Sequence, residues 1–137
     1  MKTLVIYYSY TGKTKKIAED LANRESADII EAKEKKLRSK FNAYVFGSFA
    51  AMGQKQAELQ PFSADFSAYD RIIIAMPIWA GYPAPAMNNI ISLLPKGKKI
   101  ELIMTSGSGN SKSTCEKTKA LIKAKGCDVV KYEDIKA

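Results

Sequence analysis

TLVIYYSYTGKTKKIAEDLA, residues 3–22, predicts a strand, a loop and a helix in direct succession. Residues 3–8 form a continuous apolar run, which is typical of a strand that is covered on both faces. A helix is predicted from about Lys13, because the apolar residues that follow share one helical face: Ile17, Ala18, Leu21 and Ala22. A buried strand that leads through a polar loop into an amphipathic helix indicates a chain of alternating strands and helices.

The rest of the chain continues this alternation. Further strands are predicted at residues 27–32, 71–77, 100–105 and 128–132. Two further helices present the faces Met87, Ile90, Ile91, Leu94 and Cys115, Thr118, Ile122, and Gly126 is placed to cap the second. The pattern predicts an α/β fold with a parallel sheet, right-handed crossovers and helices on both faces. A chain of 137 residues is expected to form a single domain, residues 1–137.

The least regular crossover is residues 33–70. Its apolar residues again have helical spacing, although Gly47 and Gly53 weaken the helix: Phe41, Tyr44, Val45, Phe49 and Met52. We expect this stripe to pack on the sheet; the alternative is an amphipathic helix that lies on a membrane.

Composition excludes several kinds of site. The chain has no histidine, which excludes a histidine-ligated metal site and a serine–histidine or cysteine–histidine nucleophile pair. Its two cysteines form no CxxC pair, so reduced core thiols are expected. No apolar run approaches the roughly 20 residues that span a bilayer, so we expect a cytoplasmic protein. The net charge of +8 is dispersed over several segments, which favours a solvated surface over a nucleic-acid or membrane interface.

Residues 12–14, GKT, are the last three letters of a Walker A phosphate loop. That loop requires GxxxxGK[ST], and the position of its first glycine is occupied by Tyr7, inside the predicted strand. A Walker B carboxylate is also missing, because the apolar strand at 71–77 ends in Met-Pro. The two observations exclude a nucleoside-triphosphate site of this type.

What remains is SYTGKT, residues 9–14, at a helix N-terminus. Free backbone N–H groups and the helix dipole favour an anion there. Hydroxyls of Ser9, Thr11 and Thr14 add donors, and Gly12 lets the backbone approach a ligand closely. The loop is short enough to suit one terminal phosphate. The alternative is that Ser9 and Thr11 only cap the helix.

Two more unusual loops follow predicted strands at their carboxyl ends. They are PIWAGYPAP (77–85), which holds the only tryptophan, and TSGSGNS (105–111), which is rich in glycine. In an open parallel sheet, ligands bind outside the carboxyl ends of the strands, so all three loops belong to one edge. Trp79 is then a flat surface for a ring. The glycine-rich loop can offer backbone N–H groups to a polar ring edge.

These three loops, in this order, resemble those of the flavodoxin family over nearly the whole chain. The resemblance implies a three-layer sandwich with a five-stranded parallel sheet in the order 2-1-3-4-5, and FMN as cofactor. Three sets of residues would then surround FMN. Its phosphate would be held by Ser9, Tyr10, Thr11, Gly12, Lys13 and Thr14. Its ring would be flanked by Pro77, Ile78, Trp79, Ala80 and Gly81, and approached at the pyrimidine edge by Ser106, Gly107, Ser108 and Gly109.

The chain departs from the family pattern at the ring. The second flanking loop has no aromatic residue, so one flavin face is either open or covered by Tyr82 or Tyr10. The loops 77–85 and 105–111 contain neither Asp nor Glu, so we expect less repulsion of the reduced, anionic flavin than in acidic flavodoxins.

The function expected from the resemblance is electron transfer between transient redox-partner proteins through bound FMN, by a monomer or weak dimer. The alternative is an NAD(P)H-dependent quinone or flavin reductase of the same fold, which the open flavin face favours. A third possibility is a nucleic-acid or membrane-surface module that uses the lysine-rich faces. We expect no specific nucleic acid, no membrane span and no catalytic or metal-binding side chain.

Overall fold

The computed structural model describes residues 2–10, 12–33, 65–79, 82–107, 109, 111 and 116–136. Within these ranges the strands are β1 (Thr3–Tyr7), β2 (Asp28–Glu31), β3 (Arg71–Trp79), β4 (Tyr82–Pro83), β5 (Lys99–Ser106) and β6 (Asp128–Lys136). The helices are α1 (Lys13–Glu25), α4 (Ala86–Leu93) and α5 (Glu116–Ala124), with a short 3-10 turn at Phe66–Ala68.

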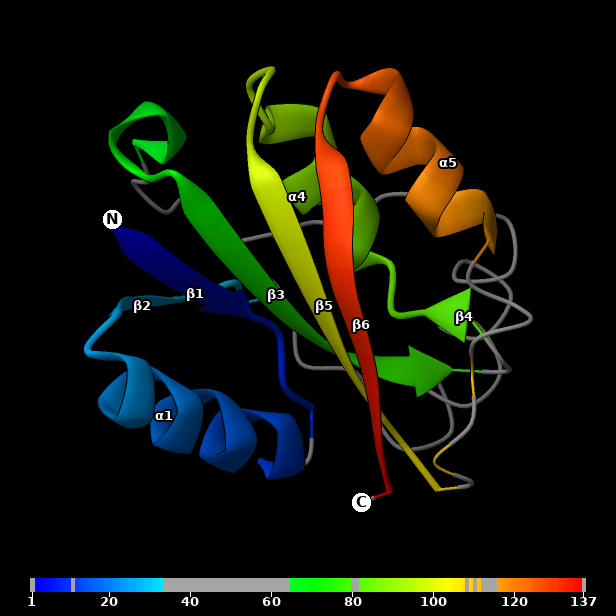
Figure 1. Ribbon diagram of the computed structural model, residues 1–137. Coiled ribbons are helices and arrows are strands. Elements are labelled where there is room, and N and C mark those ends of the chain that lie inside the picture. The colour runs from blue at the N-terminus through cyan, green and yellow to red at the C-terminus, as the bar shows by residue number, and fades with distance from the viewer. Residues whose placement is uncertain are drawn as a thin grey trace.

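Five strands form a parallel sheet in the order β2-β1-β3-β5-β6 (Figure 1). This confirms the predicted order 2-1-3-4-5, because the fourth and fifth predicted strands are β5 and β6. The strand labelled β4 has only two residues and pairs antiparallel with β3 outside the main path. The strands β2 and β6 are the two edges. Near its start β6 has a bulge, where Ile100 pairs with Val129 and Glu101 with Lys131.

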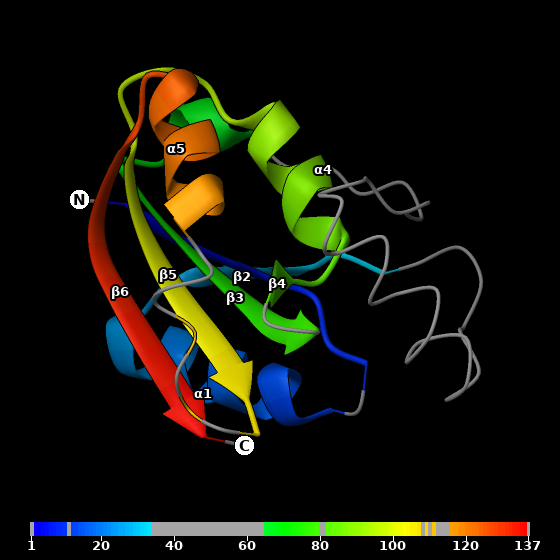
Figure 2. The same ribbon diagram turned by 90° about the vertical axis from the view of Figure 1, so that its right-hand side faces the viewer.

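The sheet is covered on both faces, which makes three layers (Figure 2). Helix α1 packs on one face through Ala18, Leu21 and Ala22, whereas α4 and α5 pack on the other. The alternating residues of β3 divide between the two cores: Ile72, Ile74 and Met76 face α4 and α5, and Ile73 and Ala75 face α1. Burial on both sides explains why the strands are continuous apolar runs.

The predicted helix faces are largely confirmed. Met87, Ile90, Ile91 and Leu94 are buried, as are Thr118 and Ile122 of α5. Gly126 follows α5 with φ +83°, the left-handed conformation expected of a capping glycine. Cys127 is a free, buried thiol, as predicted. Cys115 and the stripe at 41–52 lie outside the described residues. None of the helices described is long and apolar enough to cross a membrane.

The strand predicted at 71–77 was two residues too short, and the prediction that residues 78 and 79 belong only to a loop was wrong. Strand β3 continues through Pro77 to Trp79, because Ile78 pairs with Pro83 and Trp79 with Tyr82. The Ala84 N–H also donates to the Pro77 carbonyl at 2.9 Å. Trp79 therefore lies beyond the end of the parallel sheet, in a short hairpin formed by the end of β3 and β4.

An ion cluster joins α1 to the sheet at the amino ends of the strands. Arg71, the first residue of β3, donates to Glu101 of β5 and, from Nη1, to Glu25 Oε2 of α1 at 2.9 Å. The hydrogen bond to Glu101 is the main reason that the pKa of Arg71 is raised. The hydrogen bond from Arg71 likewise lowers the pKa of Glu25 below its ordinary value of 4.5. Glu101 is only 6% exposed, so its charge depends on Arg71 for compensation.

We predict that Glu101→Gln lowers the free energy of unfolding by about 2 kcal/mol, because it removes one partner of a buried ion pair. Glu116→Gln is the control: its pair with Lys119 lies on the surface and its loss should cost less than about 0.5 kcal/mol. Urea denaturation measures both, and equal costs would contradict the prediction.

Because the pKa of Glu25 is lowered by folding, its stabilising contribution is present above pH 4.5 and is lost as the pH falls below it.

Candidate functional site

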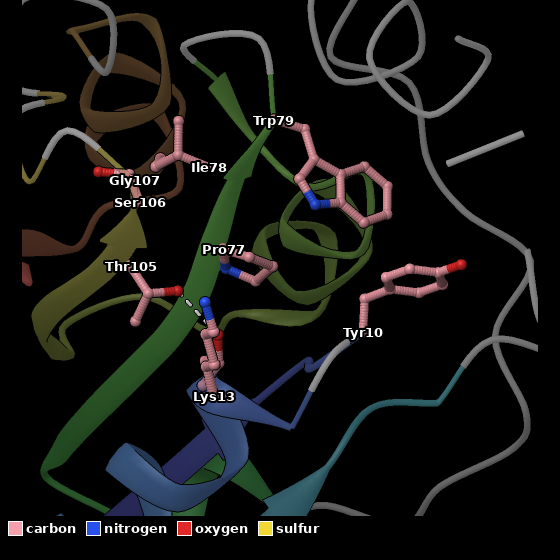
Figure 3. A pocket seen from close by; sticks show the side chains of 9 residues that line it. Tyr10, Lys13, Pro77, Ile78, Trp79, Thr105, Ser106 and Gly107 are labelled. Carbon is pink, nitrogen blue, oxygen red and sulfur yellow. Dashed lines mark hydrogen bonds between the residues drawn. The ribbon is translucent and has the colours of Figure 1, made fainter. Parts of the chain in front are cut away.

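The three unusual loops meet at the carboxyl ends of the strands and surround one pocket of about 200 Å³ (Figure 3). Helix α1, β3 and β5 all contribute to it, together with the loop after β1. The lining residues are Tyr10, Lys13, Thr14, Pro77, Ile78, Trp79, Thr105, Ser106 and Gly107. Tyr10 and Trp79 lie on one side of the pocket, and Thr105, Ser106 and Gly107 on the other (Figure 3).

The N-terminus of α1 opens toward this pocket. Gly12 is the N-cap residue, in a left-handed conformation with φ +94°, and it has no side chain with which to cap the helix. Ser9 Oγ accepts a hydrogen bond from the Gly12 N–H at 3.0 Å, which fixes the loop one residue before the helix. The first-turn N–H groups have no partner within an α-helix. Ser9 therefore shapes the loop and leaves those donors to a ligand, while Thr11 lies outside the described residues.

Tyr7 excludes a triphosphate loop in the structure as it did in the sequence. It is a buried residue of β1, at the position where a Walker A loop would need its first glycine. Burial, followed by the nearby charge of Glu31, raises the pKa of Tyr7 to about 12. Because Tyr7 belongs to β1, no phosphate loop begins at this position.

The cationic group of the pocket is Lys13. It is an exposed residue of the first turn of α1 and lines the pocket. Among the described residues no carboxylate forms an ion pair with it. Its charge is therefore available to an anion at the helix N-terminus.

Thr14 and Thr105 form a hydrogen-bonded pair of hydroxyls across the floor of the pocket. Their Oγ1 atoms are 2.8 Å apart, and the two residues are 2% and 4% exposed. Sequence reasoning included Thr14 in the site but left out Thr105, which it placed at the end of a strand and at the start of the glycine-rich loop. The signal that could have found Thr105 is its position: a hydroxyl at the carboxyl end of a buried strand, at the first residue of the glycine-rich loop.

Trp79 is held in place by two tyrosines. The ring of Tyr8 meets it edge-on with centroids 5.8 Å apart, and the ring of Tyr10 does so at 6.1 Å. Such T-shaped contacts are a favourable aromatic arrangement. Tyr10 thus belongs to the same wall of the pocket as Trp79 (Figure 3). The sequence left the second flavin face open, covered by Tyr82 or covered by Tyr10, and the position of Tyr10 beside Trp79 does not favour the last of these.

The glycine-rich loop is fastened to the end of β6. Ser106 Oγ accepts from the Gly109 N–H at 2.9 Å, and Ser111 donates its N–H to Asp134 Oδ1 at 3.1 Å. The Ser111 hydroxyl also donates to Asp134 and lies 2.5 Å from the Tyr132 hydroxyl. The fold therefore brings the carboxylate of Asp134 next to a loop that has no acidic residue of its own. Sequence reasoning missed it, because Asp134 lies 23 residues after Ser111.

Most of the residues selected from the sequence are brought together. Eight line the pocket: Tyr10, Lys13, Thr14, Pro77, Ile78, Trp79, Ser106 and Gly107. Ser9, Gly12 and Gly109 shape the loops without lining the pocket. Thr11, Ala80, Gly81 and Ser108 lie outside the described residues.

Two glycines of the site make a matched pair for a stability test. Gly12 has φ +94° and Gly107 an ordinary φ, and a Cβ atom at either position would meet nothing within 4 Å. We predict that Gly12→Ala costs about 1 to 2 kcal/mol through backbone strain alone, whereas Gly107→Ala is nearly neutral. Thermal or urea denaturation measures both costs. Equal stability of the two variants would show that the left-handed conformation of Gly12 is not required.

Comparison with known proteins identifies the family. The sequence model described as Flavodoxin matches residues 2–133. No curated protein sequence matches the chain. Among solved structures, the flavoprotein of Lactobacillus acidophilus NCFM in complex with FMN is 25% identical, with a TM-score of 0.81 over 96% of this chain and 91% of that one. The NMR structure of its apo-form is also 25% identical, with a TM-score of 0.69 over 97% and 92%.

The flavodoxin of Streptococcus pneumoniae TIGR4 is 15% identical, with a TM-score of 0.59 over 100% of this chain and 87% of that one, and it shows the shared fold alone. The family match covers almost all of the chain, and the strand order and the loops at the carboxyl edge agree with it. The protein therefore belongs to the flavodoxin family.

Proposed function

We propose that the chain binds FMN in the pocket at the carboxyl edge of the sheet and transfers electrons between redox partners through it. The observation that carries the proposal is that one pocket joins a helix N-terminus to a wall with a tryptophan. An anion site and a surface for a flat ring in one pocket suit a phosphorylated flavin. The family and the FMN complex of the Lactobacillus acidophilus relative support this choice of ligand.

At the phosphate end, three kinds of donor converge. The first-turn N–H groups of α1 point out of the helix, Lys13 supplies a positive charge, and Thr14 supplies a hydroxyl. A phosphate dianion accepts hydrogen bonds from all three kinds of donor, and these contacts do not require a metal ion. The residues present therefore fit the phosphate of FMN.

At the ring end, the two walls differ in character. Trp79, fixed by Tyr8 and Tyr10, offers an aromatic surface, while Ser106 and Gly107 offer backbone groups without large side chains. Stacking on the aromatic wall would orient the ring and exclude water from that face. The backbone of residues 106–107 would then meet the polar edge of the ring.

FMN, when bound, supplies the one- and two-electron redox chemistry, so the protein needs to supply only binding, orientation and electrostatics. The described pocket agrees with that division, because its lining includes neither a carboxylate nor a histidine that could act as a general base. We propose electron transfer in the cytoplasm, with redox proteins that dock transiently at the exposed edge of the pocket.

The visible spectrum of the purified protein tests the proposal. Reconstitution with FMN, followed by gel filtration, should give the absorption bands of bound oxidised flavin at one equivalent per chain. A protein that elutes colourless after incubation with excess FMN would contradict it.

A second candidate function is the reduction of quinones or free flavin with NAD(P)H. It is favoured by the position of Tyr10, which lies on the Trp79 side of the pocket and leaves small residues, Ser106 and Gly107, on the other side. Steady-state oxidation of NADPH or NADH by the FMN-loaded protein with a quinone separates the two functions. Turnover that saturates in both substrates would favour the reductase.

Trp79→Ala should weaken FMN binding about tenfold, because it removes the aromatic surface of the pocket. Trp79→Phe is the matched variant, since it keeps a ring on the same strand and should retain most of the affinity. Fluorescence titration of free FMN measures both dissociation constants. Unchanged affinity in the alanine variant would remove Trp79 from the stacking role.

The lack of carboxylates around the proposed ring site should make the second one-electron reduction easier than in acidic flavodoxins. The described residues that line the pocket include no carboxylate, and Asp134, which is not among them, accepts a hydrogen bond from Ser111. We predict a midpoint potential for that step that is less negative than the potential of an acidic flavodoxin measured in the same buffer. Redox titration of the reconstituted protein measures it. A potential as low as that of the acidic protein would contradict the electrostatic argument.

A further inference from the structure

Thr105 lines the pocket and begins the glycine-rich loop, but it is not among the residues that the resemblance assigned to FMN. We propose that Thr105 is a positioning residue that acts through Thr14 and makes the pocket prefer a phosphorylated flavin to an unphosphorylated one. The inference rests on the proposed function, since it concerns how the same pocket distinguishes FMN from riboflavin.

The geometry places the two hydroxyls where they can act together. Thr14 is in the first turn of α1, which supplies the proposed phosphate donors, and Thr105 is near the end of β5. The two residues are 91 positions apart in the sequence, and β3 lies between β1 and β5 in the sheet. Even so, their Oγ1 atoms are 2.8 Å apart, and a dashed line marks this bond in Figure 3.

Counting protons shows why the pair matters to an anion. Each threonine hydroxyl has one proton to donate and can accept as well. The bond between the two hydroxyls uses one proton and leaves the other. A phosphate can only accept at its charged oxygens, so it favours the arrangement in which Thr105 donates to Thr14 and Thr14 donates to the phosphate. In that arrangement Thr105 fixes the direction of the Thr14 hydroxyl.

Burial strengthens this effect. Because Thr14 and Thr105 are 2% and 4% exposed, water has little access to replace either partner. Hydrogen bonds in a chain polarise one another, and the effect is larger where solvent is excluded. Without the Thr105 hydroxyl, Thr14 would keep its place but lose the partner that orients its proton. The loss would weaken the binding of a ligand that carries a phosphate and would not affect the binding of one that lacks it.

The contrast between FMN and riboflavin separates this role from a purely structural one. If the pair only held α1 against β5, its loss would weaken the binding of FMN and of riboflavin by the same factor. If Thr105 orients Thr14 toward the phosphate, only FMN binding should suffer. The ratio of the two dissociation constants is therefore the measurement that decides.

Thr105→Val removes the hydroxyl with little change of shape. We expect it to weaken FMN binding about tenfold, because the Thr14 hydroxyl loses the hydrogen bond that directs its proton to the phosphate, and to change riboflavin binding less than twofold. Thr105→Ser keeps the hydroxyl and should restore most of the preference. Thr118→Val, the same substitution at a buried threonine of α5 outside the pocket, is the control and should leave both constants unchanged.

A double-mutant cycle completes the test. Because Thr105 acts through Thr14, the variant with both threonines changed to valine should bind FMN no more weakly than Thr14→Val alone. Additive losses would overturn the proposal, as would an FMN-to-riboflavin ratio in Thr105→Val equal to that of the unmodified protein. If Thr105→Val does not fold, Thr105→Cys against Thr105→Ser gives the same contrast, because a thiol is a weak donor. If the unmodified protein binds neither flavin, the proposed function fails instead.

Discussion

The burial of β3 on both faces is the constraint on which the rest of the structure depends. Its residues alternate between a core under α1 and a core under α4 and α5, so helices must cover the sheet from both sides. The five main strands are parallel, so each is joined to the next by a crossover that returns the chain to the same edge of the sheet. The carboxyl ends of β1, β3 and β5 therefore lie together, and so do the loops that follow them. The pocket is a consequence of this topology before it is a consequence of any single residue.

Much of the fold could be predicted from the sequence, because apolar periodicity is a local signal. The continuous run of β1, the helical spacing of Met87 and Ile90, and the glycine after α5 each need only a few neighbouring residues to be interpreted. The strand order was predicted from the resemblance of the three loops to those of the flavodoxin family. The short hairpin at Trp79 could not be predicted in this way, since its prolines are typical of a loop and its pairing depends on where β3 ends.

The parts of the site that sequence reasoning missed are contacts between distant segments. Thr105 and Asp134 are ordinary residues of strands until the register of β5 and β6 sets them beside Thr14 and Ser111. No periodicity in the chain marks them. Asp134 also matters for the charge at the site, because the net charge of +8 describes the whole chain and not the surroundings of the pocket. The field at the pocket depends instead on Lys13 and on a carboxylate already engaged by a loop.

The bulge at the start of β6 has a consequence for how copies of the chain meet one another. As an edge strand, β6 presents backbone groups that could template a strand of another molecule. The bulge places Val130 out of register with β5 and leaves it 55% exposed, and Lys131 and Glu133 follow it on the strand. A bent, charged edge is a poor template for a second sheet. The bulge thus disfavours the edge-to-edge pairing of β6 with a strand of another molecule.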